Sequence, residues 1–187
     1  MRGRGGYTLI EILLVVAVLA IAATLLAPSL VGRDTYTVEA ALRRLVADVT
    51  FAQSDALAGQ GYRQVQFDPE GNGWSVVRLE ESQLGVPFDP QTAVYVRDPL
   101  SAGATQPMIC DLVADRRFAG VHLESIQIDG SQTFITFDPL GGTIAGGGVP
   151  GTGGSLLMRS DNLTYRVEFD AFTGKVSVTR VEEPSGP

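Results

Sequence analysis

Apolar and polar positions follow three different patterns along the chain, and the first is a continuous apolar run. From Ile12 to Ala27 only Thr24 is polar. Residues 7–27 would form a helix about 32 Å long, which is long enough to span a bilayer. Glu11 lies near the start of this run, although an acidic residue inside an apolar helix costs about 2.5–3.5 kcal/mol on insertion scales. We therefore expect a transmembrane segment at 7–27 whose single charge has a use.

The second pattern, in residues 28–61, has the period of an amphipathic helix. Pro28 removes one backbone hydrogen bond, so it should loosen or kink the helix, and Gly59 or Gly61 should end it. The apolar positions recur at spacings of three and four, and the intervening positions are polar. The apolar set is Val38, Ala41, Leu42, Leu45, Val49, Ala52 and Ala56, and the polar set is Arg43, Arg44, Asp48, Gln53 and Asp55.

The third pattern begins at Tyr62 and has the period of two that is typical of β-strands. Short alternating runs are separated by turns such as "PEGNG" and "AFTG". The runs are YRQVQFD, GWSVVRLE, AVYVRD, VHLESIQID, TFITFD, SLLMRS, LTYRVEFD and KVSVTRV. We expect an antiparallel β-domain at 62–181 and a tail at 182–187. Residues 141–154 contain eight glycines and should form a flexible surface loop.

Together these patterns predict an α+β fold in which a long N-terminal helix packs on an antiparallel β-sheet domain. The net charge of −7 becomes −9 once residues 1–6 are set aside, since 12 Lys+Arg then stand against 21 Asp+Glu. An acidic body disfavours nonspecific binding to nucleic acid or anionic lipid. The single Cys110 cannot form an intrachain disulfide, and the single His122 has no cluster of other zinc ligands beside it.

Three interpretations of the N-terminus remain open on these patterns. It can be a cleaved secretory signal with Ala20-Ile21-Ala22 as the cleavage region, or a plain membrane anchor. Neither gives Glu11 a use. In the third interpretation the chain is cut between Gly6 and Tyr7, and the new α-amine can neutralise Glu11 within one helix or between two packed helices.

The stretch "RGRGGYTLIE" resembles the type IV prepilin signal, with a basic leader, a glycine, an aromatic residue and Thr-Leu-Ile-Glu. The resemblance implies that residues 1–6 are a leader, that a prepilin peptidase cuts after Gly6, and that the amine of Tyr7 is methylated. Glu11 then sets subunit register in a filament, and Pro28 matches a helix-loosening proline. Tyr7 departs mildly from the commoner phenylalanine.

The family resemblance also implies a location and partners. The leader arginines keep the N-terminus cytoplasmic by the positive-inside bias, so a single-pass protein would wait in the inner membrane with a periplasmic β-domain. It would then assemble with other pilins or pseudopilins through its N-terminal helix.

Three turn motifs point to a narrower group. They are Phe67-Asp68-Pro69 with Gly73-Trp74, Phe137-Asp138-Pro139-Leu140-Gly141, and Thr173-Gly174-Lys175-Val176. Their order resembles the minor pseudopilin H of type II secretion systems and the related FimT/FimU minor pilins. A structural subunit that is not an enzyme is implied. The alternatives are a FimT-like pilin for twitching, pilus priming or DNA uptake, and a secreted or anchored β-domain that binds a small ligand.

Candidate chemistry in the β-domain is weak. Asp68 to Gly73 has the spacing that opens a calcium loop, but the twelfth position is Leu79, so a tight hairpin turn is favoured. Asp129, Asp138 and Asp170 close strands, where aspartates bond the turn backbone. Trp74 and Tyr62 are interpreted as packing residues. We expect no catalytic constellation, no metal and no cofactor.

Overall fold

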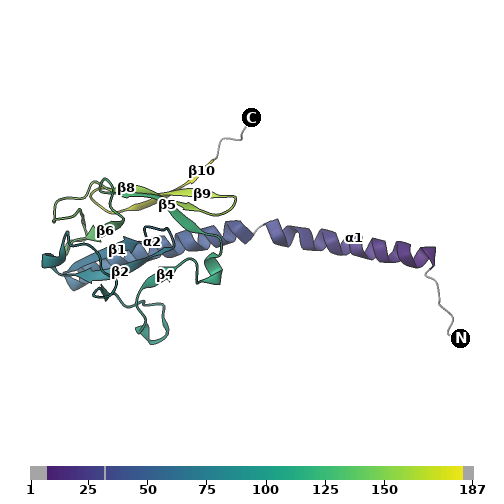
Figure 1. The fold of residues 1–187 in the computed structure, drawn as a ribbon, viewed down its shortest axis with the longest axis horizontal. Coiled ribbons are helices and arrows are strands. Elements are labelled where there is room, and N and C mark those ends of the chain that lie inside the picture. The colour runs from purple at the N-terminus through teal and green to yellow at the C-terminus, as the bar shows by residue number, and fades with distance from the viewer. Residues whose placement is uncertain (1–7, 32, 183–187) are drawn as a thin grey trace.

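The computed structural model describes residues 8–31 and 33–182, and the side chains of 23–31, 33, 34 and 104 lie outside that description. Two helices open the fold: α1 (Leu9–Val31) and α2 (Arg33–Gly59). In Figure 1, α2 lies against the strands, whereas α1 extends away from them. Helix α1 continues through Pro28 to Val31. The predicted boundary at 27/28 between a transmembrane segment and a periplasmic segment stays a prediction.

Helix α2 is amphipathic, and its apolar face is the predicted one. All seven apolar positions, from Val38 to Ala56, are buried, with exposed fractions between 0% and 6%. The helix ends at Gly59, one of the two predicted stops. Gln60 follows with a left-handed φ of 44°, and Gly61 N–H donates to the carbonyl of Ala56 at 3.1 Å. These features are those of a Schellman cap.

Among the described residues, ten strands form two antiparallel sheets. The first sheet has the order β3-β2-β1-β6-β7, and β4 also pairs with β2. The second has the order β10-β9-β8-β5. The first contains β1 (Tyr62–Phe67), β2 (Gly73–Leu79), β3 (Val94–Tyr95), β4 (Ile109–Asp111), β6 (Phe134–Phe137) and β7 (Thr143–Ile144). The second contains β5 (His122–Ile128), β8 (Gly154–Arg159), β9 (Thr164–Phe169) and β10 (Val176–Val181). Short 3₁₀ turns occur at Glu81–Gln83, Ala102–Ala104 and Arg116–Phe118.

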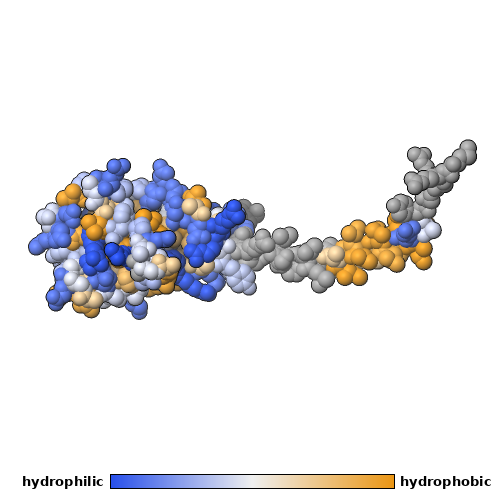
Figure 2. Space-filling model, turned by 90° about the horizontal axis from the view of Figure 1, so that it is seen from below, coloured by the Kyte–Doolittle hydropathy of each residue, from blue (hydrophilic) through white to orange (hydrophobic). Residues whose placement is uncertain are grey.

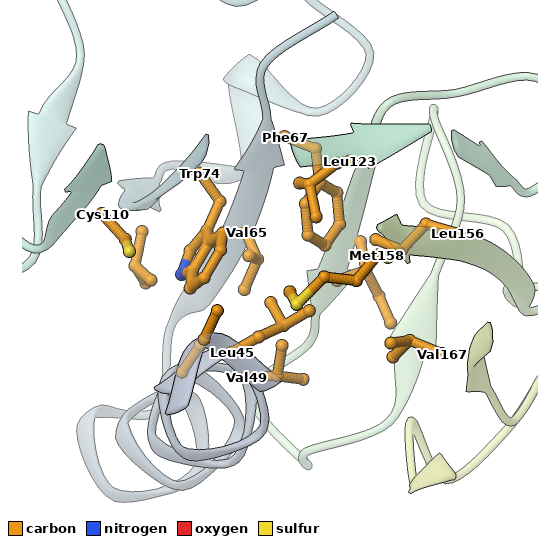
Figure 3. Close-up of a cluster of buried hydrophobic side chains, with 14 of the residues drawn as sticks. Leu45, Val49, Val65, Phe67, Trp74, Cys110, Leu123, Leu156, Met158 and Val167 are labelled. Atoms are coloured by element: carbon orange, nitrogen blue, oxygen red, sulfur yellow. The ribbon is translucent and has the colours of Figure 1, made fainter. Parts of the chain in front are cut away.

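The hydrophobic core lies where α2 meets both sheets. Leu45 and Val49 of α2 point toward Val65 and Trp74 of the first sheet, as Figure 3 shows. From the second sheet, Leu123, Leu156, Met158 and Val167 complete the same cluster. The expected fold, an N-terminal helix packed on antiparallel β-structure, is therefore confirmed.

The sequence did not predict the number of sheets: the β-structure divides into two, and α2 contacts both. Two details differ from the sequence-based expectations. The predicted glycine-rich surface loop contains β7, whose Thr143 and Ile144 are buried and pair with β6. Asp48, assigned to the polar side of the helix, is only 2% exposed. Its position three residues after Leu45 and one before Val49 places it at the border of the apolar face.

Candidate functional site

The start of α1 is closed by a reciprocal pair of hydrogen bonds between Thr8 and Glu11. The backbone N–H of Thr8 donates to Glu11 Oε2 at 3.4 Å, and the backbone N–H of Glu11 donates to Thr8 Oγ1 at 3.3 Å. This arrangement is a capping box, which satisfies two of the free N–H groups at a helix N-terminus. It also places a carboxylate where the helix dipole favours negative charge.

The capping role was missed at the sequence level, although a signal for it was present. Thr-Leu-Ile-Glu fits the Thr-x-x-Glu pattern that opens many helices. Glu11 is thus not an isolated charge, since in the single chain it already bonds the backbone of Thr8. This geometry does not test a role for Glu11 in subunit register.

Over residues 9–21, the side chains of α1 are exposed and, apart from Glu11, apolar. Its large apolar side chains between Leu9 and Ile21 have exposed fractions from 49% to 82%. Figure 2 shows them as a hydrophobic rod beside a body of mixed, mostly hydrophilic colour. Within the described parts of the chain, no helix combines the length and apolarity needed to cross a membrane.

The remaining predicted N-terminal site residues are only partly covered. Gly6 and Tyr7, predicted for cleavage and N-methylation, lie outside the described residues, as do the rest of the leader and tail residues 183–187. The kink predicted at Pro28 stays a prediction, because α1 runs through this position and the side chain is not described.

A buried polar cluster links α2 to the first sheet, and the sequence analysis did not predict it. Asp48 Oδ2 accepts hydrogen bonds from Arg44 Nε and from Trp74 Nε1, each at 2.9 Å. Arg44 Nη2 also donates to Asp98 Oδ2 at 2.6 Å. Trp74 is buried as expected for a packing residue, but its indole N–H gives it a polar task as well.

The protonation of this cluster follows from burial and pairing. Burial raises the pKa of Asp48, and the hydrogen bonds from Arg44 and Trp74 oppose this shift. For Asp98, burial also acts to raise the pKa, but hydrogen bonds from Arg44 and from the Leu100 backbone lower it overall. The pKa of Arg44 is raised because its two carboxylate partners outweigh its own desolvation. In this cluster the charged groups of Asp48, Arg44 and Asp98 are paired with one another, and they join the helix to the sheet.

Cys110 of β4 is buried next to this cluster. Burial, and secondarily the charge of Asp48, raise the pKa of its thiol to about 12. A thiol with such a pKa stays protonated at neutral pH, so Cys110 is a poor nucleophile and metal ligand. Over the described residues, no group of three or more His, Cys, Asp or Glu side chains could hold a metal ion.

The turn from Asp68 to Gly73 is a tight β-hairpin, as favoured over a calcium loop. The N–H of Asp68 donates to Gly73 O at 2.9 Å, and Asp68 Oδ1 accepts from the N–H of Glu70 at 3.1 Å. Asp138 and Asp170 likewise bind the N–H groups of their own turns. Asp129 behaves differently, because its carboxylate accepts from Thr152 in the glycine-rich segment.

Comparison with known proteins finds a known motif at the N-terminus. Residues 1–27 match the family model described as the prokaryotic N-terminal methylation motif. The chain carries this methylation motif. Thr8 and Glu11, which form the capping box, both lie inside it.

Two solved structures illustrate what the fold is similar to. One is the type IV minor pilin FimU of Pseudomonas aeruginosa, at 12% identity and a TM-score of 0.46, covering 76% of this chain and 87% of that one. The other is the minor pseudopilin EpsH from the Type 2 Secretion System of Vibrio cholerae, at 10% identity and a TM-score of 0.48, covering 78% and 97%. No curated protein matches the sequence.

Proposed function

We propose that the protein is a minor pseudopilin, a structural subunit of a type II secretion pseudopilus that helps assemble the filament driving secretion across the outer membrane. The observation that carries this proposal is the methylation motif followed by an exposed apolar helix on a folded body. The order of the three turn motifs supports a place in the group that includes both pseudopilin H and the FimT/FimU minor pilins. The function lies in interfaces, so neither an active site nor a cofactor is required.

The surface of α1 supports a function in assembly. A helix that is apolar on every side is stable only when lipid or other helices surround it. We propose that residues 7–27 lie in the inner membrane before assembly and pack against the helices of other subunits afterwards. Arg2 and Arg4 would keep the N-terminus in the cytoplasm, which leaves the β-domain in the periplasm.

Glu11 has a defined place in this proposal. Cleavage after Gly6 would create an amine on Tyr7, the residue that directly precedes Thr8 in the chain. The Glu11 carboxylate bonds the Thr8 N–H, so it is already held within one residue of that position. In a filament, the same carboxylate would neutralise the amine of its own chain or of a neighbour, and this would favour subunits in register.

A FimT/FimU-like minor pilin is the alternative, since its filament would use the same N-terminal motif. Direct DNA capture by such a pilin is disfavoured by the acidic charge and by a tail, VTRVEEPSGP, in which Glu182 and Glu183 accompany Arg180. A role in priming a pilus would not require a basic surface, so the acidic charge does not disfavour it.

Processing provides the first test. The full chain is expressed with and without a prepilin peptidase, and its N-terminus is read by mass spectrometry. We expect an N-methylated Tyr7 start only when the peptidase is present. An intact Met1 in its presence, or a start near Ala23, would contradict the proposal.

The role of Glu11 is tested with two variants that separate charge from capping. Glu11→Ala removes both, whereas Glu11→Gln keeps a side chain that can complete the capping box. We expect normal cleavage of both variants and weakened incorporation of both into filaments, measured by shearing filaments from cells and probing for the subunit. Wild-type incorporation of Glu11→Gln would show that capping alone suffices and would remove the charge-pairing argument.

Co-assembly separates the two filament systems. Crosslinking of the processed subunit to the major pseudopilin, with loss of secretion when the gene is deleted, is the expected result. Crosslinking to a major type IV pilin instead, with secretion intact, would favour the FimT/FimU alternative.

A further inference from the structure

A pocket on the face of the first sheet opposite α2 is not used by the N-terminal motif. It has a volume of about 560 Å³. Its floor is a row of side chains in register across four strands: Phe134 of β6, Gln66 of β1, Ser75 of β2 and Ile109 of β4. Residues directly opposite in antiparallel strands point to the same face, so these four form a continuous surface.

One wall of the pocket is aromatic and held in place. Phe88, Pro90 and Tyr95 come from the segment that follows β2. The hydroxyl of Tyr95 donates to the carbonyl of Pro90 at 3.2 Å, which fixes the ring within the wall. Aromatic rings attract flat or cationic groups that lie against their faces.

The end of the pocket near the β1–β2 turn is acidic. Asp68 and Asp111 line it, and both flank Gly73: Asp68 N–H donates to Gly73 O, and Asp111 lies opposite Gly73 in the β2–β4 pairing. Their Oδ1 atoms accept from turn N–H groups. Among the residues the structure describes, neither forms an ion pair, and no Lys, Arg or His lines the pocket.

The floor contains a hydrogen-bond acceptor without a donor. Gln66 is 8% exposed, and its Nε2 donates to Thr133 Oγ1 and to the carbonyl of Phe67, each at 3.1 Å. Its Oε1 has no partner in the described part of the protein. A buried acceptor without a donor costs free energy, which a bound donor would recover.

We propose that this pocket binds an arginine side chain presented by a protein partner. The side chain offers an apolar stem for the floor, a flat guanidinium for the aromatic wall, and five N–H donors for the carboxylates and Gln66. An acidic ligand would be repelled, and a purely apolar one would desolvate Asp68, Asp111 and Gln66 without pairing them. The proposal does not depend on the N-terminal motif, because the residues that line the pocket all belong to the β-domain.

The test measures binding to the pocket by isothermal titration calorimetry. The full chain in dodecyl maltoside micelles is titrated with N-acetyl-arginine methylamide and with N-acetyl-citrulline methylamide, an uncharged analogue of the same shape. We expect saturable binding of the arginine probe and at least about fivefold weaker binding of the citrulline probe.

Matched variants locate the effect. Asp111→Asn and Asp68→Asn keep the Oδ1 acceptor of each turn and remove the charge, and each should weaken the arginine probe about fivefold. Gln66→Met should weaken both probes. The control is Asp161→Asn, an exposed position in the β8–β9 turn, which should have no effect. The absence of saturable binding, equal affinity for the two probes, or an equal loss in the Asp161→Asn control would overturn the proposal.

Discussion

Asp48 brings a carboxylate into the interface between α2 and the first sheet, where it bonds Arg44 and Trp74. The two partners differ in kind, because Arg44 supplies charge and Trp74 supplies only a neutral donor. Removing the charged partner therefore leaves an uncompensated buried anion, which is more costly than the loss of an exposed ion pair.

We expect Arg44→Leu to lower the free energy of unfolding by about 3–5 kcal/mol. The control is Arg43→Leu at the adjacent position, where the side chain is 81% exposed and pairs with Glu39 on the surface. That change should stay within about 0.5 kcal/mol. Urea unfolding followed by circular dichroism measures both, and equal losses would contradict the buried-pair interpretation.

The double variant Arg44→Leu with Asp48→Leu provides a further check at this scale. It removes the buried anion together with its partner, so it should cost less than the sum of the two single changes.

At the scale of the element, the end of α2 places a residue with a Cβ atom in a backbone conformation that favours glycine. Gln60 adopts the left-handed conformation at φ 44°, where a Cβ atom is unfavourable and glycine is the usual residue. We expect Gln60→Gly to stabilise the protein by about 1 kcal/mol. Gln60→Ala keeps the Cβ and should leave stability near that of the wild type, as measured by thermal or urea unfolding. A gain with alanine equal to that with glycine would exclude the backbone explanation.

Elements were predictable where the sequence shows a regular period. The buried face of α2 from Val38 to Ala56 follows from the helical period. Strands as long as β1, β2 and β9 follow from the alternation of apolar and polar residues, although five consecutive residues of β1 and of β2 are buried. Strands β4 and β7 have three and two residues, too few to show any period, and the second lies among glycines. Asp48 was assigned to the exposed face of α2 because the polarity pattern of a helix contains no information about distant residues. Its burial depends on Trp74, which is far along the chain and donates a hydrogen bond to it.

The candidate site was predictable in part for a similar reason. The motif around Glu11 is local in sequence, so it could be recognised, and its capping box could have been recognised too. The pocket could not be predicted, because its floor combines Gln66, Ser75, Ile109 and Phe134 through pairings between strands that are distant in the chain.

At the scale of the molecule, one of the contacts between the two sheets is made at a crowded glycine. Gly71 in the β1–β2 turn has φ +80° and accepts a hydrogen bond from the N–H of Leu123 in β5 at 2.9 Å. A Cβ at Gly71 would collide with the carbonyl of Leu123, so any side chain there must push one sheet away from the other.

We expect Gly71→Ala to destabilise the protein by about 2–5 kcal/mol, since backbone strain and overpacking add. Gly120→Ala is the matched control, because Gly120 has nearly the same φ, +81°, but no atom within 4 Å of the added Cβ. It should cost only about 1–2 kcal/mol. Urea unfolding compares the free energies of unfolding of the two variants. A similar loss in both would show that the contact with Leu123 adds nothing to the cost of a Cβ at Gly71.

The division between α1 and the core has a mechanical consequence. The buried cluster begins at Val38, and no described side chain of α1 belongs to it. A pull along α1 would therefore reach the sheets through α2, whose buried residues extend to Ala56 along most of the helix. Such a load would shear the helix–sheet interface along its whole length at once, and would not peel the strands apart one at a time.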